Sequence, residues 1–425
     1  MIFLYNLLVF VLLPLWLLFL WRSQKRFALK ERLGFLPKRK DNPLWIHSVS
    51  LGEVKIALIL IDKLKAKGFN LFLTTTTSSG MGEFEKKQID CCFFPIDFIL
   101  FMKIALLRVK PSALILIETE IWPSLFYLCN KNRIPIFILN ARLSEKILKY
   151  YKIFKVLFAD IISKIWILAS SSEYEKRYIE IGANEKKVLK TGNMKFDIKI
   201  PSDEELSRFY LSVRDFIKEN IEIWVAGSVR EGEEEKIIKC QKRIMEVYNN
   251  VRLIIAPRHL NRVGKILEQC YKEGMKVVLR SEFPSKDWDV LILDTYGELL
   301  YTYSLSKISF VGGSLVDFGG QNPLEPAIFK NCIIIGENYS NFTNEVRLLK
   351  ENRGVVIVKN EEELFSKIKY LYENEEDRRF FGENSYNAVM ECKGATEKNV
   401  EFISNILCYQ NGSCASITKG DKKDG

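Results

Sequence analysis

Residues 310–326, FVGGSLVDFGGQNPLEP, combine side chains that suit the binding of a phosphate and a ribose. Two glycine pairs, 312–313 and 319–320, let the backbone approach a phosphate closely, and the N-terminus of a following helix favours negative charge. Asn322 and Glu325 lie around that expected helix start, and the Glu325 carboxylate can accept hydrogen bonds from both ribose hydroxyls. The pattern is neither GxGxxG nor Walker A, which argues against a dinucleotide dehydrogenase and a P-loop ATPase. A purely structural glycine turn is the alternative interpretation.

Basic residues follow small turns elsewhere in the second half. Arg258 ends the apolar run 251–259, VRLIIAPRH, and a forked guanidinium suits a phosphate. Lys195 lies in TGNMKFD at 191–197, where we expect it near a cleft between two domains. The segment 226–235, AGSVREGEEE, again places a small turn between an apolar run and a helical stretch. All three segments are candidates for a phosphate site.

Glu31 lies in KERLGF, residues 30–35, shortly after an apolar N-terminal segment. A carboxylate beside a membrane can act as a general base if it lies within hydrogen-bond reach of the attacking hydroxyl of a lipid-borne sugar. The alternative interpretation is an ordinary solvated glutamate in a charged helix. The residue types alone favour that alternative.

A strand end followed by a helix start is expected in HSVSLGEV, residues 47–54. Its small residues are Ser48, Ser50 and Gly52. Free N–H groups at a helix start bind anions, and serine hydroxyls can add to them, so a carboxylate or phosphate would fit. The alternative is a plain serine N-cap with Glu53 in the first turn.

Polar residues also follow apolar runs in ETEIWPSL at 118–125 and NARLSEK at 140–146. In doubly wound sheets, ligands bind outside the carboxyl ends of the strands. The candidates for such a site are Glu118, Glu120, Asn140 and Arg142.

The composition restricts the partners and cofactors. The 425 residues carry a net charge of +10, which suits an anionic partner such as phospholipid headgroups or a phosphorylated substrate. Nine scattered cysteines without a CxxC pair indicate reduced thiols in the cytosol. With two histidines in all, no metal site is expected, and the acidic triplet DWD at 287–289 is interpreted as a solvated loop.

Short apolar runs alternate with amphipathic stretches, which predicts parallel α/β sheets. In the first half these runs are residues 43–49, 70–77, 91–96, 113–119, 134–140 and 164–170. In the second half they are residues 221–228, 251–259, 275–281, 289–295, 307–314, 332–337 and 355–360. Each series predicts one Rossmann-like, doubly wound domain.

Residues 2–21 are apolar except for Asn6, and a helix of that length spans a bilayer core of roughly 30 Å. The flank 22–40 is strongly basic, and the positive-inside rule places it on the cytoplasmic side. The predicted organisation is therefore a transmembrane anchor at 1–21, a first domain at 22–198, a second domain with a C-terminal helix at 199–407, and a disordered tail at 408–425.

Taken in order, the motifs resemble the 3-deoxy-D-manno-octulosonic acid (Kdo) transferase family of lipopolysaccharide biosynthesis. The resemblance spans roughly residues 30 to 327 and rests on ERLG, HSVSLGEV, ETEIWP, NARLS, GNMKFD, AGSVREGEEE, APRH, DTYGEL and FVGGSLVDFGGQNPLEPA. It implies a GT-B fold, with two Rossmann-like domains facing a cleft. It also implies an inverting, metal-independent transfer from CMP-Kdo to a lipid A precursor at the bacterial inner membrane, with the catalytic body on the cytoplasmic side.

The resemblance also implies roles for single residues. Glu31 matches the catalytic base in the ER-x-G element of the family. Residues that match donor-binding elements are Lys195, Arg258, Gly312, Gly313, Ser314, Asn322 and Glu325. Ser48, Ser50, Gly52, Glu118 and Arg142 remain candidates for acceptor or anion binding. Two positions depart from the pattern, because Arg230 and Gln321 stand where the family usually has histidine.

Two other functions remain compatible with parts of the sequence. A nucleotide-sugar epimerase can share the two-domain fold and a glycine-rich nucleotide site, but it needs no membrane anchor. A catalytically silent binder of lipid or nucleotide would need only the basic flank. No cofactor and no nucleic-acid partner is expected.

Overall fold

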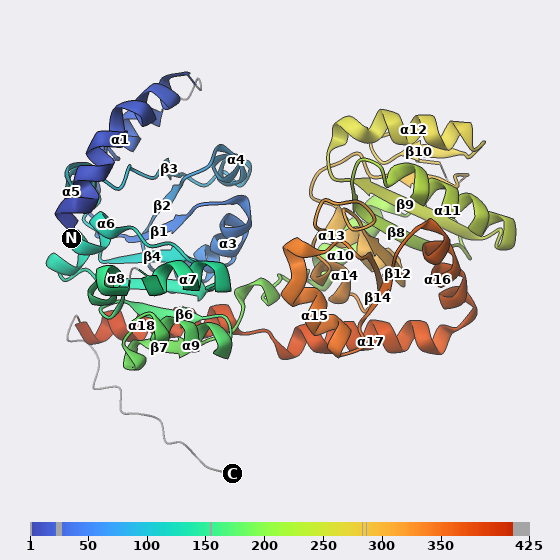
Figure 1. Cartoon of the computed structure of the whole chain (residues 1–425). Helices are drawn as coiled ribbons and strands as arrows, with labels where there is room; N and C mark the ends of the chain where they lie inside the picture. Colours follow the sequence, from blue (N-terminus) through green and yellow to red (C-terminus); the bar gives the residue numbers. More distant parts are fainter. Residues whose placement is uncertain (1, 23–27, 154, 283, 286, 411–425) are drawn as a thin grey trace, which may run out of the picture. The chain divides into compact units, whose positions relative to one another are not determined.

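The computed structural model describes residues 2–22, 28–153, 155–282, 284–285 and 287–410 (Figure 1). The described chain divides into two compact units. Residues up to Asp197, together with those from Lys393 onward, form the first unit, and Ile198–Cys392 form the second. The chain therefore passes twice between the units.

The first unit contains a sheet of seven parallel strands in the order β3-β2-β1-β4-β5-β6-β7. The strands are β1 Leu44–Ser48, β2 Leu71–Thr75, β3 Cys92–Phe93, β4 Ala113–Ile117, β5 Ile136–Ala141, β6 Trp166–Ala169 and β7 Val188–Lys190. The chain starts in the middle at β1, runs outward to β3, and then crosses to β4. The reversal lies between β1 and β4, which is where doubly wound sheets bind ligands.

Helices cover both faces of this sheet (Figure 1). The helices are α1 Ile2–Arg22, α2 Leu29–Arg32, α3 Leu51–Ala66, α4 Ser78–Lys86, α5 Ile99–Val109, α6 Pro123–Lys131, α7 Glu145–Ile153, α8 Lys155–Ile162, α9 Ser172–Glu180 and α18 Ala395–Gln410. Two single-turn 3-10 helices, η2 Glu185–Lys187 and η3 Met194–Phe196, flank β7.

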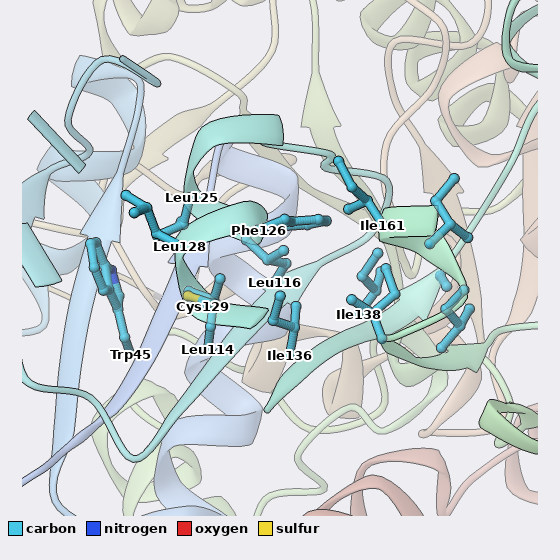
Figure 2. Packing of buried hydrophobic residues seen from close by; sticks show 14 of the residues in the cluster. Trp45, Leu114, Leu116, Leu125, Phe126, Leu128, Cys129, Ile136, Ile138 and Ile161 are labelled. Atoms are coloured by element: carbon cyan, nitrogen blue, oxygen red, sulfur yellow. The ribbon is translucent and has the colours of Figure 1, made fainter. Parts of the chain in front are cut away.

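The apolar runs of the strands form the core between sheet and helices. Figure 2 shows one face, where α6 lays Leu125, Phe126 and Cys129 against Leu114 and Ile136 of the sheet. All five side chains are buried, and burial of apolar surface contributes roughly 25 cal/mol per Å². On the other face, strand residues pack with α3 and α18.

The second unit repeats this architecture with seven parallel strands in the order β10-β11-β9-β8-β12-β13-β14. They are β8 Glu222–Val229, β9 Val251–Pro257, β10 Val277–Leu279, β11 Val290–Ile292, β12 Ile308–Val311, β13 Cys332–Gly336 and β14 Val355–Val358. The helices are α10 Asp203–Val213, α11 Glu234–Val247, α12 Val263–Lys272, α13 Leu299–Thr302, α14 Leu324–Ala327, α15 Thr343–Glu351, α16 Glu361–Glu373 and α17 Glu375–Glu391. The 3-10 turns are η4 Leu260–Arg262, η5 Tyr303–Leu305 and η6 Ser340–Phe342.

All strands expected from apolar runs are present, and the first unit has β7 in addition. The C-terminal region differs from the single helix expected within the second domain. Gly394, at φ +98, separates α17 from α18, and α18 packs on the first unit. The tail expected at 408–425 lies outside the described residues beyond Gln410.

The helix expected near the N-terminus is present as α1. Tyr5 donates a 3.0 Å hydrogen bond to the Asp97 carboxylate, and the buried Asn6 side chain donates to Ser124 and accepts from the amide of Ile99. Within the part of the chain that is described, no helix is long and apolar enough to cross a membrane. The predicted membrane span is therefore unconfirmed, and residues 23–27 of the basic flank lie outside the described residues.

Candidate active site

Glu31 lies on the single-turn helix α2, and its carboxylate is tied to the strand edge. Its Oε2 accepts a 2.5 Å hydrogen bond from the backbone N–H of Phe93 in β3. Gly34 ends the turn at φ +86, and a Cβ there would lie 2.2 Å from the carbonyl oxygen of Phe101. Only glycine fits such a position, so the ERLG element has a structural reason for its glycine. The side chain of Glu31 is half-buried.

Arg32 fastens the same turn to two loops. Its guanidinium donates to the carbonyl oxygens of Phe94 and Thr76 at 3.0 and 2.6 Å. Burial lowers the pKa of Arg32 to about 10, so the group stays charged at neutral pH. The buried His47 stacks on Phe94 with ring centroids 3.8 Å apart, and burial lowers its pKa to about 3. A neutral His47 is therefore a packing residue.

The serine-rich turn before α3 is a helix cap. Ser50 is the N-cap, and its hydroxyl accepts from the amide of Glu53 and donates to the Glu53 carboxylate. The other carboxylate oxygen of Glu53 accepts from the amide of Val49 at 2.6 Å. These contacts match the capping alternative. Ser48 is buried at the end of β1, whereas a Cβ on Gly52 would meet only the Ser50 hydroxyl within 4 Å.

Glu118, Arg142 and Lys195 come together at the carboxyl ends of the strands. The Glu118 carboxylate lies 3.9 Å from Arg142 Nε and 3.7 Å from Lys195 Nζ. Glu118 follows β4, Arg142 follows β5, and Lys195 belongs to η3 just after β7. Glu118 has φ +66, a left-handed conformation that is unfavourable for glutamate and is frequent at functional sites. Lys195 thus lies in the first unit beside an acceptor-site candidate.

The turn that carries Lys195 is held by its neighbours. The buried Asn140 accepts a 3.0 Å hydrogen bond from the amide of Met194, and Asn193 accepts one from the amide of Lys195. The Asp197 carboxylate accepts from the amides of Gly394 and Thr396 at 2.6 and 2.5 Å. Lys195 presents its side chain to the strand-end cluster.

Glu120 is the most strongly perturbed carboxylate near this cluster. Burial, together with the charges of Glu53 and Glu118, raises the pKa of Glu120 to about 7. Burial by the surrounding protein also raises the pKa of Tyr151 to about 12, and the charge of Glu120 adds to this. Glu120 therefore titrates in the physiological range, where a proton-transfer group is most useful.

In the second unit, Glu233 occupies the amides of the first glycine turn. This fully buried carboxylate accepts from the amides of Gly313, Ser314 and Leu315 at 2.6, 2.9 and 2.9 Å, and from the amide of Arg230 at 2.9 Å. Burial raises the pKa of Glu233, and the four amide donors oppose this. A phosphate cannot use these amides while Glu233 holds them.

Gly312 and Ser314 also have structural contacts. A Cβ on Gly312 would lie 2.6 Å from the carbonyl oxygen of Ser228, so this glycine allows β12 and β8 to pack closely. The Ser314 hydroxyl donates to the carbonyl oxygen of Val311 and accepts from the amide of Gly336. The roles of Gly312, Gly313 and Ser314 in binding the sugar donor remain predictions. In this conformation the amides of Gly313 and Ser314 would not donate hydrogen bonds to it, because Glu233 accepts them.

Arginine side chains supply positive charge at this edge of the sheet. Arg258 follows β9, and its amide donates to the carbonyl oxygen of Val229 in β8 at 2.8 Å. Arg230 follows β8, and its Nη1 lies 2.7 Å from His259 Nε2. Burial, Arg230 and Arg258 all lower the pKa of His259. None of the described carboxylates lies within 4.0 Å of either guanidinium.

Asn322 and Glu325 lie at the start of the single turn α14. Asn322 accepts from the amide of Leu324 and donates to one Glu325 carboxylate oxygen, both at 3.1 Å. The second oxygen of Glu325 has no partner among the residues that the structure describes, which leaves it open to a hydroxyl donor. The predicted ribose contact is thus compatible with the geometry.

Glu233 and Arg230 were not assigned roles from sequence. Residues 231 to 235 contain four glutamates, and spacing does not distinguish the one that accepts from the amides of the glycine turn. The DWD triplet was expected in a solvated loop. Asp287 is exposed and pairs with Lys276 at 2.6 Å, but Trp288 is buried and donates to the carbonyl oxygen of Phe216, so that prediction was wrong for Trp288.

Two solved structures share this architecture. A crystal structure of a glycosyltransferase from Rickettsia africae covers 86% of this chain and 99% of that chain, at TM-score 0.55 and 14% identity. A UDP-GlcNAc 2-epimerase from Neisseria meningitidis, bound to UDP-GlcNAc, covers 85% and 100%, at TM-score 0.59 and 15% identity. These similarities establish the fold, an α/β GT-B-like fold with two parallel seven-stranded sheets.

Sequence similarity is more specific. A family model described as 3-Deoxy-D-manno-octulosonic-acid transferase (kdotransferase) matches residues 28–198. The 3-deoxy-D-manno-octulosonic acid transferase of Haemophilus influenzae is 32% identical over 394 residues, which cover 90% of this chain and 92% of that protein. The chain belongs to the 3-deoxy-D-manno-octulosonic acid transferase family, and it is a glycosyltransferase of lipopolysaccharide biosynthesis.

Proposed function

We propose that the chain transfers Kdo from CMP-Kdo to a lipid A precursor, with inversion at the anomeric carbon and without a metal. The observation that carries this proposal is the 32% identity to a Kdo transferase over nearly the whole chain. The two uncompensated guanidinia of Arg230 and Arg258 support an anionic donor in the second unit.

In the proposed reaction, Glu31 accepts the proton of a sugar hydroxyl on the lipid. The hydroxyl oxygen then bonds to the anomeric carbon of Kdo, and the bond from that carbon to the phosphate oxygen breaks, so that CMP leaves with both electrons. One Glu31 oxygen is held by the amide of Phe93, and the other has no partner among the described groups. This leaves an acceptor oxygen for the proton.

The negative charge that develops on the departing phosphate requires nearby donors. Arg258 is the proposed partner, and fixed cations at this position stabilise the transition state more than the ground state. Lys195 is also proposed to contact the sugar donor. Because Lys195 lies beside Glu118 and Arg142 in the first unit, this contact requires that part of the sugar donor bind at the strand-end cluster. Glu325 is the proposed ribose partner through its open carboxylate oxygen.

The proposed location is the cytoplasmic face of the bacterial inner membrane. The apolar residues 2–21 and the basic flank 22–40 support it, because apolar surface and positive charge together favour anionic lipid headgroups. Flotation of the full chain with vesicles that contain anionic lipid tests this location. A chain that stays in the soluble fraction would contradict it.

Incubation of purified enzyme with CMP-Kdo and a lipid A precursor tests the activity. The expected product is the lipid with added Kdo and free CMP, detected by mass spectrometry, with equal rates in the presence and absence of a chelator. Failure to modify the lipid would overturn the proposal, and an isomerised sugar nucleotide would favour the epimerase alternative, whose fold is shared by the Neisseria enzyme.

A further inference from the structure

The two residues that depart from the family pattern are neighbours in the structure. A Cβ built on Gly313 would lie 3.4 Å from Arg230 Cγ and 3.4 Å from Gln321 Nε2. Arg230 follows β8, whereas Gln321 belongs to the segment after β12. Both side chains thus flank one face of Gly313, although 91 positions separate them in the sequence.

The guanidinium of Arg230 is held in place without being neutralised. Its Nη1 donates to His259 Nε2 at 2.7 Å, and its Cζ lies 4.8 Å from the centroid of the Phe318 ring. Because arginine has no acceptor atom, His259 must accept through Nε2, which requires a neutral imidazole with its proton on Nδ1. The buried Nε of Arg230 has no hydrogen-bond partner.

Three other arginines of the second unit have a different environment. Arg243, Arg262 and Arg280 each form a salt bridge with a glutamate, at 2.6, 2.7 and 2.9 Å. No described carboxylate pairs with Arg230, and the amide of Gln321 makes no hydrogen bond to a described residue. A forked cation and a neutral N–H donor therefore meet at one point, and each has N–H groups without an acceptor among the described residues.

The backbone amides at Gly313 are not available to bind an anion. Glu233 already holds the amides of Gly313, Ser314 and Leu315. An anion that approaches Gly313 must therefore be bound by side chains, and Arg230 and Gln321 are the donors that flank it. Their fork and amide suit an oxyanion that takes two or more hydrogen bonds.

We propose that Arg230 and Gln321 together bind an anionic oxygen of the sugar donor, from its phosphate or its sugar carboxylate, as a specificity-determining pair. The proposal rests on the proposed function, because it assigns the pair to the donor of that reaction. His259 and Phe318 orient the guanidinium in advance, which reduces the entropy lost on binding.

Steady-state kinetics of the full chain test the pair. In R230Q the donor KM is expected to rise roughly tenfold or more, the loss typical of one charged hydrogen bond, while the acceptor KM stays within about twofold. Q321A is expected to raise the donor KM by roughly two- to tenfold. R243Q is the matched control, since Arg243 also lies over a phenylalanine ring, at 4.0 Å, but it belongs to α11 and pairs with Glu362.

Calorimetric titration with CMP distinguishes the two anionic groups. An equal loss of CMP affinity in R230Q assigns the contact to the phosphate, whereas unchanged CMP affinity with a raised donor KM assigns it to the sugar carboxylate. Unchanged CMP affinity and unchanged donor KM would overturn the proposal. If R230Q does not fold, R230M, which keeps the stem over Phe318 and removes the charge, is judged by the same criteria.

The two proposals fail in different ways. A wild-type enzyme that transfers no sugar contradicts the proposed function. Calorimetric titration of wild type and R230Q with CMP and with CMP-Kdo then decides on the pair, which is overturned if neither affinity changes. A wild-type enzyme that transfers Kdo, with R230Q unchanged in both assays, contradicts only the pair.

Discussion

Carboxylates of similar sequence context have different tasks in this protein. Glu233 is fully buried and accepts four amide hydrogen bonds, so it fastens the glycine turn. Glu53 completes the cap of α3. Glu31 accepts one described hydrogen bond and remains half-buried, which leaves one oxygen for chemistry. The number of fixed donors around each carboxylate thus separates the structural glutamates from the proposed base.

Replacement of Glu120 by glutamine is expected to change the pH dependence of stability. The pKa of Glu120 in the folded state is raised to about 7 from an ordinary value of 4.5. The ionised form is therefore penalised in the folded state, and the stability of the wild type falls as the pH rises from about 4.5 to about 7. Because E120Q removes the ionisation, it should gain roughly 1–3 kcal/mol relative to wild type between pH 5 and pH 8. Urea denaturation at both pH values measures this, and a difference that does not change with pH would contradict it.

At the scale of elements, the loops after the strands position the site. Asn140, Asn193 and Asp197 hold the turn that carries Lys195, and Asp197 also binds the amides at the start of α18. The last helix is thereby tied to the same segment that presents a candidate site residue. In the GNMKFD element, Asn193 and Asp197 therefore stabilise the turn, and Lys195 is the candidate site residue.

Replacement of Asp197 by alanine should destabilise the first unit by about 1–2 kcal/mol, because the amides of Gly394 and Thr396 lose their acceptor. Chemical denaturation gives this value. The exposed Asp215 provides the control, and D215A should leave the unfolding midpoint unchanged. Equal midpoints for D197A and wild type would show that Asp197 does not fasten α18.

Periodicity and composition predicted the strands because parallel sheets buried on both faces consist of apolar runs. They did not predict β7, since VLK within EKKVLKTG has only two apolar residues. They also misassigned α18, because its apolar face does not say which sheet it covers. At the site, Glu118 and Arg142 were predicted as strand-end residues, whereas Lys195, predicted as a phosphate-site candidate near a cleft between two domains, lies beside them. The amides held by Glu233 follow from packing that spacing does not reveal.

At the scale of the molecule, each unit has its own sheet and core. The second unit, Ile198–Cys392, is continuous in sequence, whereas the first is completed by α18 from the C-terminal region. This connectivity determines which fragments contain a complete core.

A fragment of residues 198–392 should therefore unfold cooperatively on its own. A fragment of residues 28–197 lacks α18, exposes the face around Phe137 and Trp166 on which Phe402 packs, and should be less stable until a peptide of residues 393–410 is added. Circular dichroism during thermal unfolding measures both. Cooperative folding of 28–197 with no response to the peptide would contradict this division.

The kcat of the Glu31→Gln variant is the most direct test of the central claim. Glutamine keeps the oxygen that accepts from the amide of Phe93 but removes the base, so kcat should fall by roughly 10²-fold or more. The donor KM and the unfolding midpoint should stay near wild type, and the exposed Glu85→Gln variant should be unaffected. A Glu31→Gln enzyme with near-normal kcat would contradict the role of Glu31 as the catalytic base.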